Sequence, residues 1–224
     1  MSNVGTLVSV NVGEPVEVEY RGRVVRTAIF KTPVEHEISV GPLGLQGDTQ
    51  VDQKNHGGIH QAVYVYFSDG YEYWKNQLKR ETLHHGQFGE NLTIDGFDER
   101  SLRIGDILQI EGVRLQVSQP RQPCFKLAMK MEIDDFIDRF LKSHRLGCYC
   151  RVLQKGIIKK GAKVECLPSD ERTMSIWDVC RVRFFETKNL PENALASKLP
   201  ALSPEWKNYF YKRIKGTEFD EQNT

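Results

Sequence analysis

The residues best suited to chemistry lie in a proline-rich stretch, 117–127, that contains Cys124. Two prolines before the cysteine stiffen the backbone and remove hydrogen-bond donors, and the cations Arg121 and Lys126 flank it. Because neighbouring cations favour the thiolate, the form of cysteine that ligates metals and attacks electrophiles, this stretch predicts a metal-binding or reactive Cys124. The alternative is a buried structural cysteine next to a surface arginine and lysine.

A second group of candidates lies earlier in the chain, where Asp48 ends one Gly-containing turn and Lys54, His56, Gly57 and Gly58 follow. Paired glycines let backbone N–H groups approach an anion closely. Lys54 and His56 add a positive charge and a donor that can titrate. The segment therefore predicts an anion-binding loop. A solvated turn that happens to contain a histidine is the alternative.

A third candidate is the pair Glu90 and Asn91, which follows Gly89 and precedes a strand-like segment at 93–94. Their side chains could orient a polar ligand by hydrogen bonds from a loop at the rim of a barrel. Gly-Glu-Asn is also common in ordinary turns, so the pair alone carries little information.

The other cysteines and His60 are expected to be structural. Cys148 and Cys150 lie two apart on a predicted strand, and no second cysteine pair has zinc-finger spacing. Cys166 and Cys180 fit core positions. His60 is not expected to bind zinc, because the preceding glycines interrupt the helix that an i, i+4 pair of histidines requires. Motifs of serine hydrolases and P-loop enzymes are missing from the sequence, which argues against those classes.

The composition is that of an ordinary globular protein. The chain has 224 residues, of which 39% are hydrophobic and 27% charged, and its formal net charge is +1. This charge gives no reason to expect a stable nucleic-acid complex. No apolar run is long enough for a membrane helix, and the N-terminus does not resemble a signal peptide. Five cysteines without a disulfide pattern favour a reducing compartment, so the cytoplasm is the expected location.

The elements that must position these residues are mostly short strands. A period of two dominates up to residue 167, and strands are predicted at 6–12, 16–20, 24–30, 62–67, 107–110, 113–118, 148–153 and 162–167. Many short strands with tight turns favour a barrel or sandwich. Helices are predicted at 68–79, with Ser68 as its cap, and at 134–141. Three short helices that begin near 173, 191 and 203 should dock on the barrel; Gly216 should end the last, and residues 218–224 should be frayed.

Taken in order, these segments resemble the MOSC family, named for the C-terminal domain of molybdenum cofactor sulfurase. The similarity lies in residues 44–48, 56–58, 88–92, 105–106 and 121–126. The helical remainder resembles the small three-helix domain of the bacterial YiiM-type branch. The resemblance implies a mainly β fold with α: a MOSC-type β-barrel domain over 1–167 and a three-helix domain over 170–224.

The resemblance also implies the molybdenum cofactor, molybdopterin with molybdenum, with Cys124 as the metal ligand. A soft thiolate suits a sulfur-rich metal centre, and the pterin phosphate needs cations and N–H donors. No pyridoxal phosphate is expected. The residues assigned to cofactor binding on this basis are Lys54, His56, Gly57, Gly58, Glu90, Asn91, Arg121 and Lys126.

The activity that the resemblance implies is the reduction of small N-hydroxylated compounds, including base analogues such as 6-hydroxylaminopurine, for detoxification. Cys124 would take part as the metal ligand, and His56 or Asp48 would handle protons. A separate reductase must supply electrons, because the sequence carries no flavin, haem or iron–sulfur signature. A non-catalytic carrier of the cofactor or of sulfur is the alternative, and a cysteine-nucleophile enzyme is a third class. A homodimer is left open.

Overall fold

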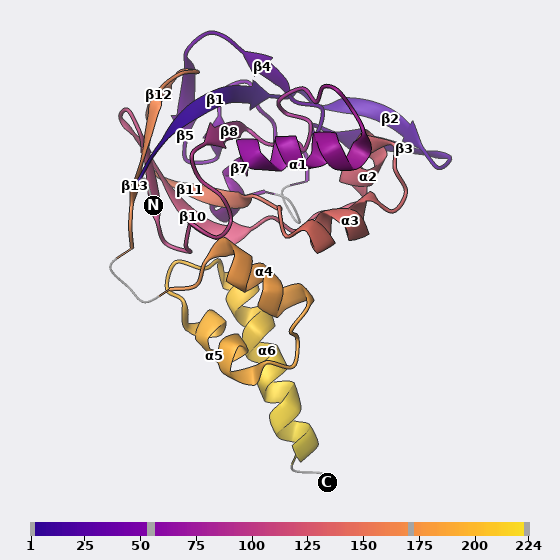
Figure 1. Ribbon diagram of the computed structural model, residues 1–224, viewed down its shortest axis with the longest axis vertical. Coiled ribbons are helices and arrows are strands. Elements are labelled where there is room, and N and C mark those ends of the chain that lie inside the picture. The colour runs from indigo at the N-terminus through magenta and orange to yellow at the C-terminus, as the bar shows by residue number, and fades with distance from the viewer. Residues whose placement is uncertain (1–2, 53–56, 170–172, 222–224) are drawn as a thin grey trace.

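The main body of the protein is a closed β-barrel (Figure 1). A computed structural model describes residues 3–52, 57–169 and 173–221. In ring order the barrel strands are β13 (Lys163–Leu167), β9 (Ile107–Ile110), β10 (Val113–Pro120), β11 (Cys148–Gln154), β7 (Val63–Phe67), β8 (Leu92–Asp95) and β1 (Val4–Val12), which pairs back with β13. β7 and β8 run parallel, and the other neighbours in the ring run antiparallel. The mainly β prediction with added helices is therefore confirmed.

Shorter strands decorate the barrel. They are β2 (Val16–Tyr20) and β3 (Arg23–Thr27), which form a hairpin, β4 (Thr32–Val34) beside β1, and a three-stranded sheet of β5 (Ile38–Gly41), β6 (Gly44–Leu45) and β12 (Gly156–Ile158). The hairpin turns at Arg21 and Gly22, whose φ values of 51° and 73° are those of a type I′ turn. The sequence predicted a hairpin turn here because of Gly22, and the structure confirms it. The strand predicted at 24–30 ends earlier, at Thr27.

Three helices lie against the barrel, two of them, α1 and α3, through aromatic side chains. They are α1 (Ser68–Leu78), α2 (Phe125–Met131) and α3 (Phe136–Ser143). Trp74 of α1 lies 4.8 Å from Phe136 of α3 between ring centroids, and Phe88 lies 5.7 Å from Phe140. Strand β7 is buried along its whole length, which explains its continuous apolar sequence. Ser68 is the first helical residue of α1 rather than its cap, because Phe67 occupies the cap position.

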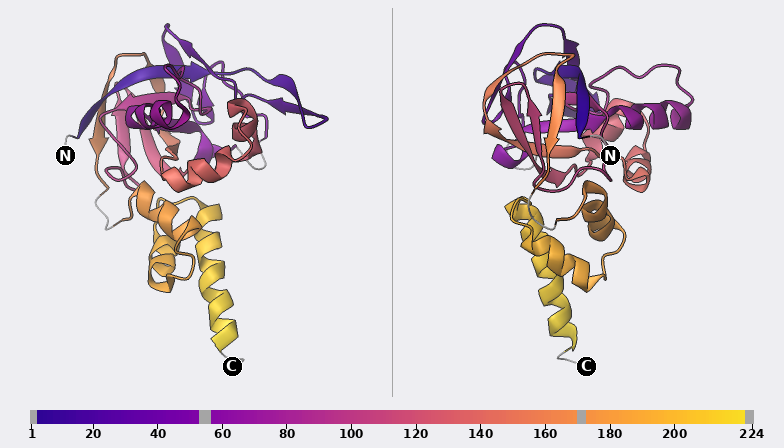
Figure 2. Two further views of the ribbon diagram at one scale, coloured as in Figure 1. Left: turned by 45° about the vertical axis from the view of Figure 1, so that its right-hand side comes forward. Right: turned by 60° about the vertical axis from the view of Figure 1, so that its left-hand side comes forward.

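The C-terminal part is helical: α4 (Ile176–Phe184), α5 (Leu190–Lys198) and α6 (Pro204–Glu221). Ser175 caps α4 in a reciprocal hydrogen-bonded pair with Asp178. The prediction that Gly216 ends the last helix is wrong, because α6 continues to Glu221 and extends away from the barrel (Figure 2). Of the residues predicted to fray, 218–221 are helical and 222–224 lie outside the described residues. A glycine weakens a helix by about 1 kcal/mol but does not stop it unless the chain also adopts a left-handed turn.

The helical unit docks on the barrel, as its small size predicted, and several of the hydrogen bonds between them involve main-chain atoms. The Ser203 amide donates to the Ser118 carbonyl at 3.0 Å, and the Arg151 guanidinium donates to the Ala201 carbonyl at 2.6 Å. A third contact joins the Trp177 amide to the Glu99 carbonyl at 2.8 Å. The end of β10 is therefore attached to the helices, and β10 leads directly into the segment that contains Cys124.

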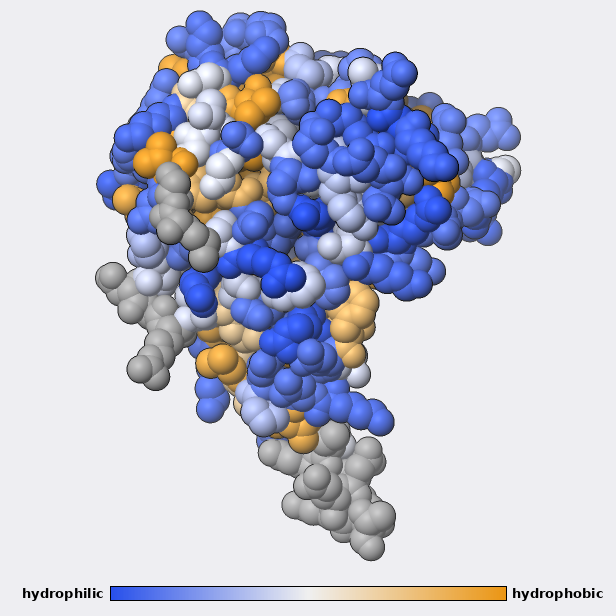
Figure 3. Space-filling model, in the orientation of Figure 1, coloured by the Kyte–Doolittle hydropathy of each residue, from blue (hydrophilic) through white to orange (hydrophobic). Residues whose placement is uncertain are grey.

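The surface is mostly polar, and its exposed apolar side chains lie in separate small patches on the face shown in Figure 3. Among the described residues, none of the helices has both the length and the apolar character needed to span a membrane.

Candidate functional site

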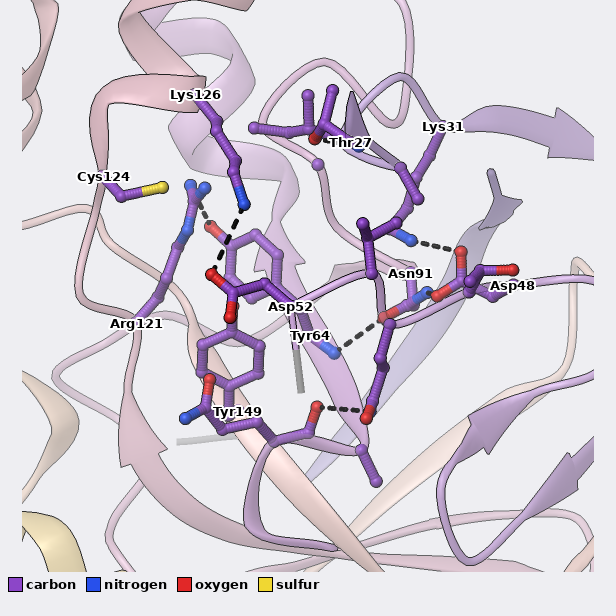
Figure 4. Close-up of a pocket in the computed structure, with 18 of the residues that line it drawn as sticks. Thr27, Lys31, Asp48, Asp52, Tyr64, Asn91, Arg121, Cys124, Lys126 and Tyr149 are labelled. Atoms are coloured by element: carbon purple, nitrogen blue, oxygen red, sulfur yellow. Dashed lines mark hydrogen bonds and ion pairs between the residues drawn. The ribbon is translucent and has the colours of Figure 1, made fainter. Parts of the chain in front are cut away.

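A cleft opens in the wall of the barrel, beside the start of α2 (Figure 4). It holds about 690 Å³ of unfilled space, part of it open to solvent. Its lining comes from the segments 27–31 and 48–52, from residues 61–64 around the start of β7, from residues 89–91 before β8, from Tyr149 of β11, and from residues 121–126 in the loop before α2 and its first turn. The cleft therefore collects residues that lie far apart in the sequence.

Cys124 lies at the N-cap of α2, in an extended conformation with φ −133° and ψ 171°. Its carbonyl accepts the first helical hydrogen bond, from the Leu127 amide at 2.9 Å. The side chain is half-buried, and its sulfur points toward the Arg121 guanidinium (Figure 4). The chain's other four cysteines are buried, and none of the five forms a disulfide. Cys124 is thus the cysteine that a ligand in the cleft can reach, and its role as a metal ligand stays a prediction.

Arg121 places a buried positive charge beside this sulfur. Its side chain is 4% exposed, its Nη1 donates to the Tyr64 hydroxyl at 3.5 Å, and its guanidinium lies 4.8 Å from the centroid of the Tyr64 ring. Burial opposes the charge, but the phenols of Tyr64 and Tyr149 outweigh it and raise the pKa of Arg121. The nearby Cys124 acts in the same direction. Arg121 therefore stays charged at any physiological pH.

Lys126 brings a second cation from the first turn of α2. Its Nζ lies 3.7 Å from Asp52 Oδ2, and its side chain is 14% exposed. Figure 4 shows the lysine reaching from above the cleft toward Asp52. Lys126 and Arg121 thus approach the same space from two elements.

Asp48 lies on the opposite wall and is held by three donors. Lys31 forms an ion pair with Oδ1, the Gly13 amide donates to Oδ1 at 2.9 Å, and the Asn91 side chain donates to Oδ2 at 2.8 Å. Burial lowers the pKa of Lys31, although Asp48 opposes this. The proton role predicted for Asp48 would have to act through the Lys31–Asp48 pair, because both carboxylate oxygens are occupied.

Asn91 and Glu90 are neighbours in the sequence but differ in their position relative to the cleft. Asn91 lines the cleft, and its side-chain oxygen accepts from the Tyr64 amide at 3.0 Å. Glu90 is fully buried and does not line the cleft. Its carboxylate accepts from the amides of Gly86 at 2.7 Å and Phe88 at 3.1 Å, so it stabilises the loop that carries Asn91.

The predicted anion-binding loop is only partly described. Lys54 and His56 lie outside the described residues. Gly58 has a φ of 84°, which favours glycine, and its amide donates to Gln50 Oε1 at 2.9 Å. Gln50 lines the cleft, whereas Gly57 and Gly58 do not. In the part of the chain that the structure describes, no cluster of three His, Cys, Asp or Glu side chains could hold a metal ion.

Sequence analysis missed several polar residues of the cleft, among them Lys31, Tyr64 and Tyr149. Lys31 follows Phe30 with no motif around it, and Tyr64 and Tyr149 belong to strands whose aromatic residues resemble core. The Tyr64 and Tyr149 rings lie 5.2 Å apart, and burial raises the pKa of Tyr149. Helix α2 was missed as well, although the apolar pattern of Leu127, Ala128 and Met131 is a signal that could have found it.

Comparison with known proteins gives a consistent family assignment. The model of the MOSC domain matches residues 52–165, and that of the YiiM-like 3-alpha helix domain matches residues 174–217. The "Uncharacterized protein YflK" of Bacillus subtilis is 36% identical over 208 residues, which are 93% of this chain and 94% of that protein. The crystal structure of YiiM from Geobacillus stearothermophilus has 34% identity and a TM-score of 0.80, and the match covers 94% of this chain and 99% of that one.

A longer relative is also informative. A protein of Gibberella moniliformis named "Reductase" is 32% identical over 196 residues, which are 86% of this chain but 34% of that protein. The barrel, the helical unit and these matches lead to one conclusion: the chain belongs to the MOSC-domain family and carries a YiiM-like 3-alpha helix domain.

Proposed function

We propose that the protein binds the molybdenum cofactor in this cleft and reduces small N-hydroxylated compounds, including base analogues such as 6-hydroxylaminopurine. The observation that supports this most directly is the half-buried Cys124 sulfur beside the buried Arg121 cation in a cleft. Membership of the MOSC family supports the choice of cofactor. The name of the Gibberella moniliformis relative supports reductive chemistry, although this chain covers only 34% of that protein.

The residues of the cleft fit the chemistry of this cofactor. A soft thiolate suits a sulfur-coordinated metal, and Cys124 is held by an ordered helix start, which fixes its direction. The anionic phosphate of the pterin needs charge-assisted donors. Arg121 and Lys126 line the cleft and can supply them. When bound, the cofactor supplies the two-electron redox chemistry that protein side chains lack.

The side chains of the protein bind and orient the substrate and transfer protons. The overall reduction consumes two electrons and two protons and converts an N–OH group into N–H and water. Electrons must come from outside, and we propose a separate reductase as the donor. The described groups of the cleft that can carry a proton include the Tyr149 hydroxyl and the Lys31–Asp48 pair. The histidine predicted for this role, His56, lies outside the described residues.

The test compares protein made in a host that synthesises the cofactor with protein made in a host that cannot. We expect the first preparation to contain bound molybdopterin and to reduce 6-hydroxylaminopurine to adenine with an artificial electron donor. The second preparation should be inactive. Bound cofactor without turnover would support the alternative, a carrier of the cofactor. Equal activity in both preparations would contradict the proposal.

A further inference from the structure

A buried arginine of the helical domain reaches the loop that carries Cys124. Arg183 lies in the last turn of α4 and is 7% exposed. Its Nη2 donates to Gln122 Oε1 at 2.6 Å. Gln122 lies two residues before Cys124 and lines the cleft. One hydrogen bond thus joins the helical domain to the wall of the functional site.

Arg183 stacks on aromatic rings of the helical domain, whose faces attract a cation. Its guanidinium lies 4.2 Å from the Trp206 ring centroid and 3.8 Å from that of Tyr209. Its Nε and Nη1 have no hydrogen-bond partner among the described residues. The ring contacts hold Arg183 within the helical domain. The hydrogen bond to Gln122 is the contact that links its guanidinium to the cleft.

The same contact fixes the orientation of the Gln122 amide. A guanidinium can only donate hydrogen bonds, so the amide must turn its oxygen toward Arg183 and its NH2 group away. The loop has another attachment at its start, where the Arg121 amide donates to the Gly147 carbonyl at 3.3 Å. Hydrogen bonds thus hold Arg121 and Gln122 on one side of Cys124, and the start of α2 holds it on the other side.

We propose that Arg183 is a positioning residue, through which the helical domain fixes Gln122 and with it the conformation of the Cys124 loop. The helical domain thereby helps to hold the Cys124 loop in its place in the site. The link to the cofactor rests on the proposed function, whereas the coupling between Arg183 and the loop does not depend on it.

The test measures the rate at which iodoacetamide alkylates Cys124 in cofactor-free protein, followed by mass spectrometry of the Cys124 peptide. The variants are Arg183→Met, Gln122→Met and the double variant. We expect each single change to raise the rate about tenfold, the factor that corresponds to one charge-assisted hydrogen bond. The double variant should show no further rise, because both changes remove the same contact. Gln122 is exposed, so its variant should fold normally.

The matched control is Arg213→Met. Arg213 also stacks on Tyr209, at 4.4 Å from the ring centroid, and donates to the Val182 and Arg183 carbonyls at 3.2 Å and 3.0 Å, all within the helical domain. This variant should lower the melting temperature but leave the alkylation rate unchanged. Arg183→Lys should restore part of the wild-type rate, since a lysine can still donate to Gln122.

Three outcomes would overturn the proposal: unchanged alkylation in the single variants, additive effects in the double variant, or the same rise in Arg213→Met. Molybdenum content and kcat, measured separately on cofactor-loaded protein, distinguish this from the proposed function. Wild-type protein without cofactor or turnover would refute the proposed function, while the alkylation rates would still decide the role of Arg183.

Discussion

The chemistry of the cleft depends on one sulfur and a few charged side chains. Cys124 lies beside the permanently charged Arg121, and Lys126 of the first turn of α2 forms an ion pair with Asp52. Across the cleft, Asp48 is neutralised by Lys31. The net excess of positive charge lies beside the sulfur, where an anionic sulfur-bound metal and a phosphate would be stabilised.

The charge of Arg121 leads to a prediction for the loaded protein. Arg121→Ala should weaken cofactor retention by about tenfold to a hundredfold, the range expected for a charge-assisted contact of about 1.5–3 kcal/mol. The measurement is the molybdenum content after repeated dilution and concentration. Arg121→Lys should retain more cofactor than the alanine variant, because it keeps the charge but loses the bidentate geometry. An unchanged content in Arg121→Ala would remove this residue from the binding site.

Individual site residues could be predicted from sequence only where a local pattern marked them. Cys124 and Arg121 share one proline-rich stretch, and the structure places both at the cleft. Lys31 and Tyr149 reach the cleft through the closure of the barrel, so no local signal identifies them. Glu90 carried the same signal as Asn91, but its carboxylate is turned to the amides of Gly86 and Phe88 in its own loop. Only Asn91 therefore lines the cleft.

At the scale of elements, the loop before β8 is organised around Glu90. Its carboxylate accepts from Gly86, Phe88 and Thr93, and also from the Tyr71 hydroxyl of α1. All of these are donors, which explains why an acidic side chain is tolerated in a fully buried position.

Glu90→Gln should therefore destabilise the fold. A glutamine would turn an NH2 group toward at least one of these donors, and the free energy of unfolding should fall by about 2 kcal/mol. Urea denaturation measures this change. The control is Glu81→Gln, because Glu81 is exposed and its replacement should change stability by less than about 0.5 kcal/mol. Equal stability of the two variants would show that Glu90 does not organise the loop.

Regular elements were predicted well where the apolar period was long enough. Strands at 16–20 and 107–110 have the predicted bounds, because alternating side chains and flanking turns define them. Helix α2 has only seven residues, and the apolar positions Leu127, Ala128 and Met131 are the signal in the sequence that marks it. The end of α6 could not be predicted from Gly216, since a glycine is compatible with both a helix interior and a helix end.

At the scale of the whole molecule, the barrel and the helical domain meet around Glu99. Its carbonyl accepts from the Trp177 amide of α4, and its carboxylate accepts from the Gly147 amide at 2.8 Å. Burial raises the pKa of this carboxyl group to about 8. The folded protein therefore holds a proton at Glu99 that the unfolded chain releases at lower pH.

This raised pKa predicts a pH dependence of stability. Between the ordinary pKa of 4.5 and about 8, the folded state binds more protons than the unfolded state. The stability contributed by neutral Glu99 is thus complete below the lower value and is lost as the pH rises through the higher one. In Glu99→Gln this loss of stability with rising pH should be absent. The measurement compares the urea midpoints of the wild-type protein and the variant at about pH 5 and about pH 9. The same pH dependence in both proteins would exclude Glu99 as its source.

The central claim is that Cys124 ligates molybdenum, and the most direct test is the molybdenum-to-protein ratio of Cys124→Ser. Both proteins should be made in a host that synthesises the cofactor. We expect about one molybdenum per wild-type chain and almost none in the variant, because a serine hydroxyl is a harder and much less acidic ligand. Cys166→Ser is the matched control, since Cys166 is buried and does not line the cleft. A folded Cys124→Ser protein that keeps the wild-type amount of molybdenum would contradict the account.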